Sequence, residues 1–436
     1  PAKSREGQQR RGMLPLPLVA LSDALPSEIK VEQASPDLLS DYPSEGALRI
    51  LHSDCQWVAF TCYQENMQSV QEMAKIAKKV GKRVVVGGHH ITIWGGKRVL
   101  EEIPEVDFAI VGEGEFPLKL LLENRAYEEI PGLWWREGGK ILKSNYDFWL
   151  DEWEKRPPMF KGYSDFSYLH LWKRNERIGR TGHKRPFSVI GIRGCGYATR
   201  KRRRCKFCAI PLMTFRCRHP KFFWQEISWA KKELKVDLIW EHSDSFLGSQ
   251  KWLQEIAQNR PGAMPPFWCY GRADEVNSHT VKLLKEIGVE HIYIGVEVGS
   301  DERLRELNKG IVLDQVLKAI QFCRKYSIKV QVSFVFGLPG ETEETLEESI
   351  KFALKCKEWG AEDVVFHEFI IRKGLRWFEE LAKIFPQFNK VIVDQGEIQN
   401  KMWKYFNPRL DREEAVKAVK ETVKKFPDFE LTAWNI

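Results

Sequence analysis

The 436-residue chain contains no apolar run that approaches the roughly 18 residues of a membrane-spanning helix. Its first residues lack the apolar core of a secretory signal peptide, so export is not expected. Neither sign of charge dominates, because 68 lysines and arginines face 60 aspartates and glutamates for a net charge of +8. This balance permits a nucleic-acid partner without requiring one. Nine cysteines, an odd number without the spacing of a disulfide framework, favour a reducing compartment and hence the cytoplasm.

Hydrophobic residues make up 43% of the chain, enough for sizeable cores, and the length fits two or three domains. Within residues 1–130, apolar segments alternate with helical patterns, which predicts a doubly wound, Rossmann-like α/β domain with a parallel sheet. The expected strands are 29–32, 57–62, 83–88 and 106–111. The last two end in or just before glycines, which let a ligand approach the backbone closely. The residues alone therefore predict a domain that binds a ligand of nucleotide size.

The same alternation continues over residues 186–375, with six expected strands and intervening helices, fewer than the eight of a complete (β/α)8 barrel. This pattern predicts a partial (β/α)6 barrel of the TIM type. A connector over residues 131–185, with a small hairpin near 132–141, joins it to the first domain. Residues 376–436 are polar with a helical pattern, which predicts a small helical cap. The expected anchors of that cap are Trp403 and Phe406.

A cysteine-rich loop follows the apolar strand expected over residues 187–193, so it leaves the carboxyl end of a strand, where α/β folds place their chemistry. Its pattern is Cys-x9-Cys-x2-Cys, formed by Cys195, Cys205 and Cys208. Three thiolates can hold three irons of a [4Fe–4S] cluster and leave the fourth iron open to a ligand. Cys217 and His219 lie close downstream, so the spacing alone allows a structural zinc site equally well.

The insertion between the first two cysteines contains a strongly basic run, Arg200–Arg204. One interpretation is a solvated surface loop. The other is a contact for an acidic or phosphate-bearing partner. Its sequence does not distinguish the two.

The cysteine loop, with aromatic Phe207 between its last two cysteines, resembles the cluster loop of the radical S-adenosylmethionine (SAM) enzymes. The usual spacing in that family is Cys-x3-Cys-x2-Cys, from which this chain departs by its insertion. The resemblance implies that the three cysteines hold a [4Fe–4S] cluster that binds SAM. Polar groups at later strand ends fit the same family. The implied SAM contacts are Ser243 and Ser245, a fork from Arg272 to the SAM carboxylate, Glu297 at the ribose or amino group, and Gly337 beside the adenine.

The pattern Val-Val-Val-Gly-Gly-His-His, followed by Val-Asp-Phe-Ala-Ile-Val-Gly-Glu-Gly-Glu, is similar to the cobalamin-binding domain that precedes many radical SAM enzymes. The similarity covers roughly residues 10–130. The Asp-x-His-x-x-Gly motif that supplies a histidine to cobalt in other cobalamin proteins is absent. The resemblance instead implies that the loop 63–66 covers the lower face of cobalamin. The implied contacts are Tyr63, Gln64, Glu65, Asn66, Gly87, Gly88, His89, Gly112, Glu113, Gly114 and Glu115.

As a whole the chain resembles a cobalamin-dependent radical SAM methyltransferase that methylates an unactivated carbon with two molecules of SAM and an external electron donor. A protein side chain, such as a residue of methyl-coenzyme M reductase, is the favoured substrate, while a small molecule, a lipid or RNA stays open. Rearrangement or cyclisation on the same cofactors is an alternative. Methylthiolation is disfavoured because residues 1–130 contain only Cys55 and Cys62. The alternative of another class is a nucleic-acid-binding protein with zinc on Cys195, Cys205, Cys208 and Cys217.

Overall fold

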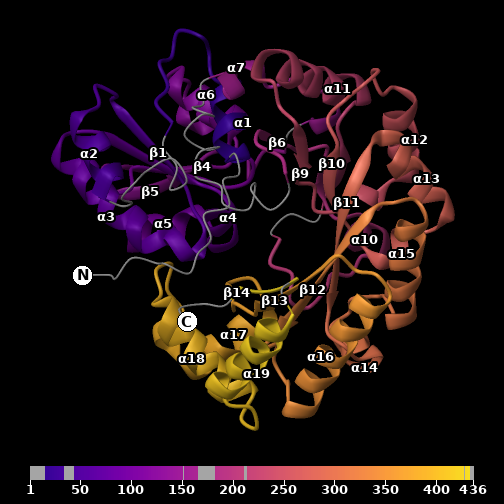
Figure 1. Cartoon of the computed structure of the whole chain (residues 1–436). Helices are drawn as coiled ribbons and strands as arrows, with labels where there is room; N and C mark the ends of the chain where they lie inside the picture. Colours follow the sequence, from indigo (N-terminus) through magenta and orange to yellow (C-terminus); the bar gives the residue numbers. More distant parts are fainter. Residues whose placement is uncertain are drawn as a thin grey trace.

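A parallel sheet of seven strands forms the core of the larger of two α/β units (Figure 1). The structure is a computed structural model, and it describes residues 15–33, 44–150, 152–164, 182–210, 214–426 and 428–432. The strands lie in the order β14-β13-β12-β11-β10-β9-β6, and β14 and β6 form its two edges. Their bounds are β6 Pro186–Val189, β9 Leu238–Glu241, β10 Phe267–Gly271, β11 Val289–Glu297, β12 Lys329–Phe336, β13 Asp363–Glu368 and β14 Phe429–Thr432.

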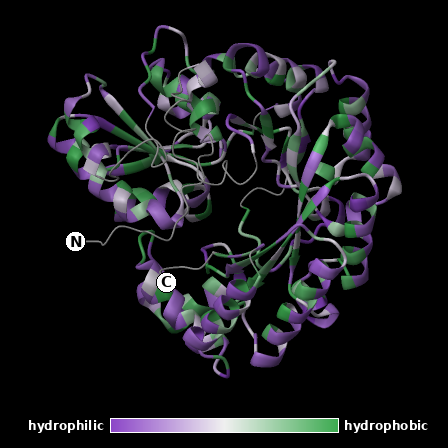
Figure 2. Ribbon diagram, viewed as in Figure 1, coloured by the Kyte–Doolittle hydropathy of each residue, from purple (hydrophilic) through white to green (hydrophobic). Residues whose placement is uncertain are grey.

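Helices cover the outer face of this sheet, and their polar sides face outward while apolar strands line the interior (Figure 2). They are α11 Pro220–Trp229, α12 Gln250–Gln258, α13 Ser278–Ile287, α14 Asp301–Glu306, α15 Leu313–Lys325 and α16 Glu343–Glu358. The C-terminal region adds α17 Arg376–Ile384, α18 Gln395–Phe406 and α19 Arg412–Lys425. The partial barrel is confirmed; five of the six predicted strands are present as predicted, the first is shorter, and β14 is an additional strand.

The smaller unit is an N-terminal mixed sheet in the order β1-β2-β3-β4-β5, with helices on both faces. Side chains of β2 alternate between the faces: Val84 and Val86 pack with α3 and α5, and Val85 packs with α6. The Rossmann-like prediction is therefore confirmed. The elements are α1 Leu16–Ala24, α2 Ser44–His52, β1 Trp57–Thr61, α3 Met67–Lys79, β2 Arg83–Gly87, α4 His89–Trp94, α5 Gly96–Glu102, β3 Phe108–Ile110, α6 Glu115–Leu122, β4 Leu133–Glu137, β5 Lys140–Lys143 and α7 Phe160–Ser164.

Four local predictions differ from the structure. Residues 29–32 form no strand. The hairpin placed in the connector is β4–β5, and its strands extend the N-terminal sheet, with β4 paired to β3. The C-terminal region is not only helical, because β14 pairs with β13. Residues 165–181 of the connector lie outside the described residues.

The fourth difference lies next to the cysteines, where the single strand expected over 187–193 is split at Gly191. The buried Glu241 carboxylate accepts a hydrogen bond from the Gly191 N–H (2.8 Å), and the Ser243 hydroxyl accepts one from the Ile192 N–H (2.7 Å). These two side chains replace the backbone carbonyls of a neighbouring strand as acceptors. The chain then pairs β7 (Ile192–Gly194) with β8 (Phe215–Cys217) in a separate antiparallel ribbon.

The N-terminal unit spans the open side of the barrel between its two edges (Figure 1). At one edge it contacts the β7–β8 ribbon, and at the other it contacts residues 371–399. Helix α1 belongs to both units, because Val19 and Ala20 pack into the barrel core while Leu21 packs against the N-terminal one. No helix among the described residues is long and apolar enough to cross a membrane.

Candidate active site

The cysteine loop begins directly after β7, where backbone geometry requires glycine. Gly194 has φ +88°, and a Cβ there would overlap the carbonyl oxygen of Thr214. Cys195 follows as the N-cap residue of α10 (Gly196–Lys201). Burial, together with the smaller effect of the neighbouring Cys205 and Cys195 thiols, raises the pKa of the Cys208 thiol to about 11. The electrostatic coupling places the three predicted cluster ligands in one group.

Cys217 stands apart from that group. It lies on β8, and its thiol hydrogen-bonds with Ser249 at the start of α12. His219 is the N-cap of α11, where its ring accepts a hydrogen bond from the Lys221 N–H (3.1 Å). Within the described ranges, no three His, Cys, Asp or Glu side chains converge as ligands of one metal ion.

The basic insertion is anchored to the barrel by three of its arginines. Arg200 donates to the Gly248 carbonyl (2.5 Å) and pairs with Glu275 (3.0 Å). Arg203 donates to the Asn308 side chain (2.9 Å), and Arg204 donates to the carbonyls of Ile210 and Gly374 (3.2 and 3.0 Å). Three arginines of the insertion therefore stabilise the loop itself. Neither interpretation from the sequence, a solvated loop or a partner contact, included this role.

A buried cation and carboxylate lie beside the cluster loop. Lys309 donates to Glu297 (2.5 Å), and its ammonium is 5.8 Å from the ring centre of Phe207. Glu297 has φ +79° and sits at an irregularity in the pairing of β11 with β12, a strained conformation typical of functional sites. Gly295 leaves the space for this pair, since a Cβ there would collide with the Glu297 carboxylate. Both Lys309 and Glu297 influence the pKa of Cys205, which burial raises.

Lys309 is a site residue that the sequence analysis missed. The available signal was a lone lysine inside the turn Asn308-Lys309-Gly310, where both flanking residues have positive φ. Arg272 lies next to this group: it donates to the Lys309 carbonyl (2.7 Å), and its guanidinium stacks 4.0 Å from the ring centre of Tyr197. Its fork, however, already pairs with Asp274 (2.9 and 3.3 Å). Its contact with the SAM carboxylate stays a prediction.

The two predicted serines behave differently from each other. The Ser243 hydroxyl donates to Glu241 and accepts from the Ile192 N–H. Both hydrogen bonds stabilise the backbone where the predicted strand is split. Ser245 is buried, and its hydroxyl has no hydrogen-bond partner among the described residues. An unpaired buried hydroxyl at the carboxyl end of β9 fits a polar group of a bound ligand. Of the two, Ser245 is the better candidate.

Gly337, predicted to lie beside the adenine, is held by the C-terminal region. It has φ +80°, and a Cβ there would collide with the ring of Trp403 on α18. Its carbonyl accepts from Asn407 (3.2 Å), and its N–H donates to the buried carboxylate of Glu341. Trp403 is thus confirmed as an anchor of the C-terminal helices, and Phe406 packs half-buried on the same core.

Glu341 gives the stability a testable pH dependence. Burial raises its pKa from 4.5 to about 7, so the folded chain holds a proton that the unfolded chain releases between these values. Stability therefore falls as pH rises from about 4.5 to 7, by roughly 3 kcal/mol for this group. Glu341→Gln keeps an oxygen that can accept the Gly337 N–H. In urea unfolding, its free energy of unfolding should therefore fall less between pH 5 and pH 8 than that of the wild type. The exposed Glu302→Gln control should keep the wild-type difference, and an equal slope in all three proteins would contradict the assignment.

A cavity of about 420 Å³ lies between the two units, at the carboxyl ends of β1, β2 and β3. Its floor is apolar, with Ala59, Val85, Ile110 and Leu118. On the barrel side it reaches Gly194, beside Cys195, and Asp244, beside Ser245. The predicted cobalamin contacts that line it are Tyr63, Gly87, Gly88, His89, Gly112, Glu113, Gly114 and Glu115.

Only the first residue of the loop 63–66 lines the cavity. Gln64 is buried, accepts from the Lys373 N–H (2.9 Å), and donates to Ile371 O (2.9 Å) and Gln395 (2.8 Å). Glu65 pairs with Arg372 (2.6 Å), and Asn66 closes the loop on Tyr63 and Thr61. The C-terminal region therefore sets the position of Tyr63.

Two adjacent histidines have different surroundings. The His89 ring is 5.8 Å from that of Tyr63 and lines the cavity, whereas the His90 ring is buried and bonds the Val391 carbonyl (2.7 Å). Burial lowers the pKa of both imidazoles, which favours their neutral forms. His90 thus fastens the N-terminal unit to the C-terminal region.

Glu113 and Glu115 have a role that the sequence did not indicate. Glu113 forms a fork with Arg216 (2.6 and 3.0 Å) and pairs with Arg193 (3.0 Å), and Glu115 pairs with Arg193 (2.5 Å). Burial alone raises the pKa of Glu115, but Arg193 and Arg156 outweigh it and lower that pKa. These residues, Glu113, Glu115, Arg193 and Arg216, form an interdomain ion cluster at the cavity wall.

We expect Arg193→Ala to lower the free energy of unfolding by about 3 kcal/mol, because it leaves the buried Glu115 carboxylate with only the more distant Arg156 (3.9 Å). Urea denaturation measures the change. The control is Lys351→Ala, which breaks an exposed pair with Glu347 and should cost less than about 1 kcal/mol. Equal effects of the two substitutions would show that the ion cluster does not hold the units together.

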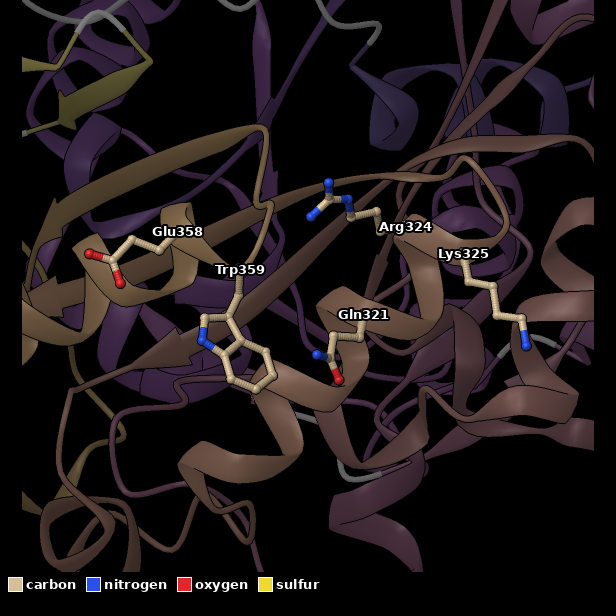
Figure 3. Close-up of a pocket in the computed structure, with 5 residues that line it drawn as sticks. All are labelled: Gln321, Arg324, Lys325, Glu358 and Trp359. Carbon is tan, nitrogen blue, oxygen red and sulfur yellow. The ribbon is translucent and has the colours of Figure 1, made fainter.

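A second hollow of about 620 Å³ lies on the outer surface, between α15 and α16 (Figure 3). It is lined by Gln321, Arg324, Lys325, Glu358 and Trp359. Its residues lie at the helix C-termini, near the amino ends of β12 and β13. This is the opposite end of the strands from the cysteine loop, so the hollow belongs to no part of the site.

The Radical SAM superfamily matches residues 270–353, and the B12 binding domain family matches residues 15–122. The chain therefore carries a radical SAM domain and a B12 binding domain. A radical SAM domain implies a [4Fe–4S] cluster and SAM, and a B12 binding domain implies cobalamin. The finding decides for the cluster over zinc, which the cysteine spacing left open. The match begins at β10 and does not include the cysteine loop, so the individual ligands stay a prediction.

Relatives share about a quarter of the residues. An uncharacterized methyltransferase of Pyrococcus horikoshii is 27% identical over 329 residues, 72% of this chain and 66% of its own. An anaerobic magnesium-protoporphyrin IX monomethyl ester cyclase of Cereibacter sphaeroides is 26% identical over 340 residues, 73% of this chain and 52% of its own. The chain thus spans about half to two thirds of the length of these curated relatives.

A solved structure shares the fold of both units. TsrM from Kitasatospora setae, a radical SAM methyltransferase with cobalamin and a [4Fe–4S] cluster bound, superimposes with a TM-score of 0.72 at 16% identity. The match covers 96% of this chain and 90% of that one. At 16% identity, this structural similarity shows a shared fold, which includes the arrangement of the two units.

The residues present fit the implied groups. Three grouped thiols suit a cluster with one open iron, and the unpaired Ser245 hydroxyl suits a polar ligand beside it. The apolar cavity floor, bounded by glycines at the ends of β2 and β3, suits a broad macrocycle. The cavity reaches the chain neighbours of the first set, Gly194 before Cys195 and Asp244 before Ser245.

Proposed function

We propose that this chain is a cobalamin-dependent radical SAM methyltransferase that transfers a methyl group to an unactivated carbon. The observation that carries the proposal is the single cavity, lined by strand-end glycines of the B12 binding domain and reaching the strand ends of the barrel beside the cysteine loop. When bound, the cluster with SAM supplies a carbon radical and cobalamin supplies a methyl group. A shared cavity holds the reacting groups together, which can lower a barrier by about 7–11 kcal/mol at best.

Residues of the chain take distinct parts in this proposal. Cys195, Cys205 and Cys208 hold the cluster. Glu297 and Lys309 form a charged wall beside it, where they can orient the polar end of SAM. Tyr63 covers the lower face of cobalamin, held by the Gln64 contacts. The interdomain ion cluster keeps the two units at one distance and closes the cavity wall to water.

The substrate stays a proposal as well. A protein side chain is our prediction from the sequence, while the name of the Cereibacter sphaeroides relative points to a tetrapyrrole and to cyclisation. The nine cysteines of the chain are free thiols in the structure, which supports a reducing compartment such as the cytoplasm.

The deciding experiment counts products under anaerobic, reducing conditions with a peptide library and, separately, a tetrapyrrole mixture. We expect one S-adenosylhomocysteine, and one 5′-deoxyadenosine with methionine, for each methyl group gained. Methylation without 5′-deoxyadenosine would establish a polar mechanism. 5′-Deoxyadenosine with a product that gains no methyl group would establish cyclisation or rearrangement.

A further inference from the structure

The exposed cations of the cysteine loop have no task in the proposed reaction. We propose that Lys201, Arg202 and Lys206 form the docking surface for an acidic one-electron donor protein, which reduces the cluster. The inference rests on the proposed function only in requiring the [4Fe–4S] cluster.

The loop presents these three side chains from a rigid frame. Arg200, Arg203 and Arg204 bind the barrel, and the Lys206 N–H donates to the Leu307 carbonyl (2.9 Å). Lys201, Arg202 and Lys206 are exposed, and the structure gives their side chains no partner among the described residues. Cations that stabilised the loop itself would be paired as the arginines are.

Their position relative to the cluster ligands is the second argument. Lys206 lies between Cys205 and Cys208, and Lys201 ends the helix that begins after Cys195. None of the cations from 200 to 206 lines the cavity, whereas Gly194 and Ile210, on either side of the loop, do. A substrate in the cavity is therefore out of reach of these charges, while a protein on the outer surface lies directly over the ligand loop.

The charge balance around the loop is positive. Three carboxylates near the loop have cationic partners: Glu275 pairs with Arg200, Asp274 with Arg272, and Glu306 with Arg303. Asp244, which acts on Cys208, lines the cavity. The unpaired cations produce a field that attracts an acidic surface, and such steering raises association rates by about 10- to 1,000-fold at low ionic strength. An RNA would meet the same charge but would gain no access to the cavity from this side.

The step requires one electron and no bond change. The reduced donor, a flavoprotein or an iron–sulfur protein, loses one electron, and the [4Fe–4S] cluster passes from the 2+ to the 1+ state. No proton needs to cross the loop. The docking surface therefore only has to bring the donor cofactor close to the cluster.

The test compares the holoenzyme with Lys201→Glu/Arg202→Glu/Lys206→Glu in stopped flow without substrate, following cluster absorbance. An acidic flavodoxin with reduced FMN is the protein donor, and the methyl viologen radical cation is the small donor. We expect the variant to react at least about tenfold more slowly with flavodoxin at low salt, with the difference lost at about 0.5 M salt, and no more slowly with viologen. The control Lys221→Glu/Lys232→Glu/Lys282→Glu, on exposed lysines of the outer helical layer, should behave as wild type.

Three results would overturn the docking surface. Equal slowing with both donors would mean that the charges maintain the cluster, and equal slowing in the control would mean that net charge alone matters. An unchanged flavodoxin rate would overturn it directly. If the same variant then lost binding to a single-stranded RNA that wild type retains, the loop would be an RNA contact. Cluster reduction is read without substrate, so failure of methyl transfer leaves this test intact.

Discussion

Replacing Cys195, Cys205 and Cys208 together with alanine is expected to remove the [4Fe–4S] cluster and all formation of 5′-deoxyadenosine. The physical reason is that the structure groups these thiols, as their coupling in the pKa of Cys208 indicates, and a cluster with an open iron needs three ligands. The three anchoring arginines do not depend on the thiols, so the loop should keep its place. Iron and sulfide analysis after anaerobic reconstitution measures the loss, and circular dichroism checks the fold.

The matched control is Cys217→Ala. Cys217 lies on β8, and its thiol interacts with the Ser249 side chain. Its replacement should therefore leave the iron content and the charge-transfer absorbance of the cluster unchanged. A cluster that survives in the triple variant would contradict the ligand assignment. So would a cluster that disappears in Cys217→Ala alone.

Glu297→Ala is expected to slow reductive cleavage of SAM by about 100- to 1,000-fold while leaving cobalamin affinity unchanged. The substitution removes the carboxylate from a strained position beside the cluster loop and leaves the Lys309 ammonium buried without its partner. Cobalamin contacts are expected in the other unit, across the cavity. Production of 5′-deoxyadenosine measures cleavage, and a visible-light titration measures cobalamin binding.

Glu302→Ala, on the exposed face of α14 five positions along, is the control and should cleave SAM at the wild-type rate. Arg272→Ala should also weaken cleavage, because it removes the guanidinium that stacks on Tyr197 and binds the Lys309 carbonyl (2.7 Å). A Glu297→Ala protein that lost cobalamin in proportion to its cleavage rate would show that the pair supports the fold rather than SAM.

The C-terminal region connects the two cofactor regions physically. It contributes Trp403 behind Gly337 at the barrel strand ends, and through Gln395 it helps to hold the loop that carries Tyr63. A segment predicted as a simple cap therefore touches both sides of the site.

The sequence by itself determined the elements and the chemistry that depend on local pattern. The pattern of apolar residues along a strand is local in sequence, which is why the strand predicted over 83–88 agrees closely with β2. The start of α16 depends on local sequence in the same way: the hydroxyl of Thr342, just before the acidic first turn, accepts a hydrogen bond from the Thr345 N–H (3.4 Å). The spacing of the three cysteines left a cluster and a zinc site open, and the resemblance of the cysteine loop and of the glycine-ended strands to known families implied both cofactors before any packing was known.

Only the tertiary structure decided which polar groups meet. Glu115 and Arg193 are 78 residues apart, and Glu113 and Arg216 are 103 apart, so no local pattern could pair them. Strand β14 is a four-residue segment whose edge position exists only because β13 is already there to pair with it. Gln64 and His90 depend in the same way on partners some 300 residues later in the chain. The free energy of such contacts comes from burial and charge brought together by folding, which a periodic pattern along the chain does not encode.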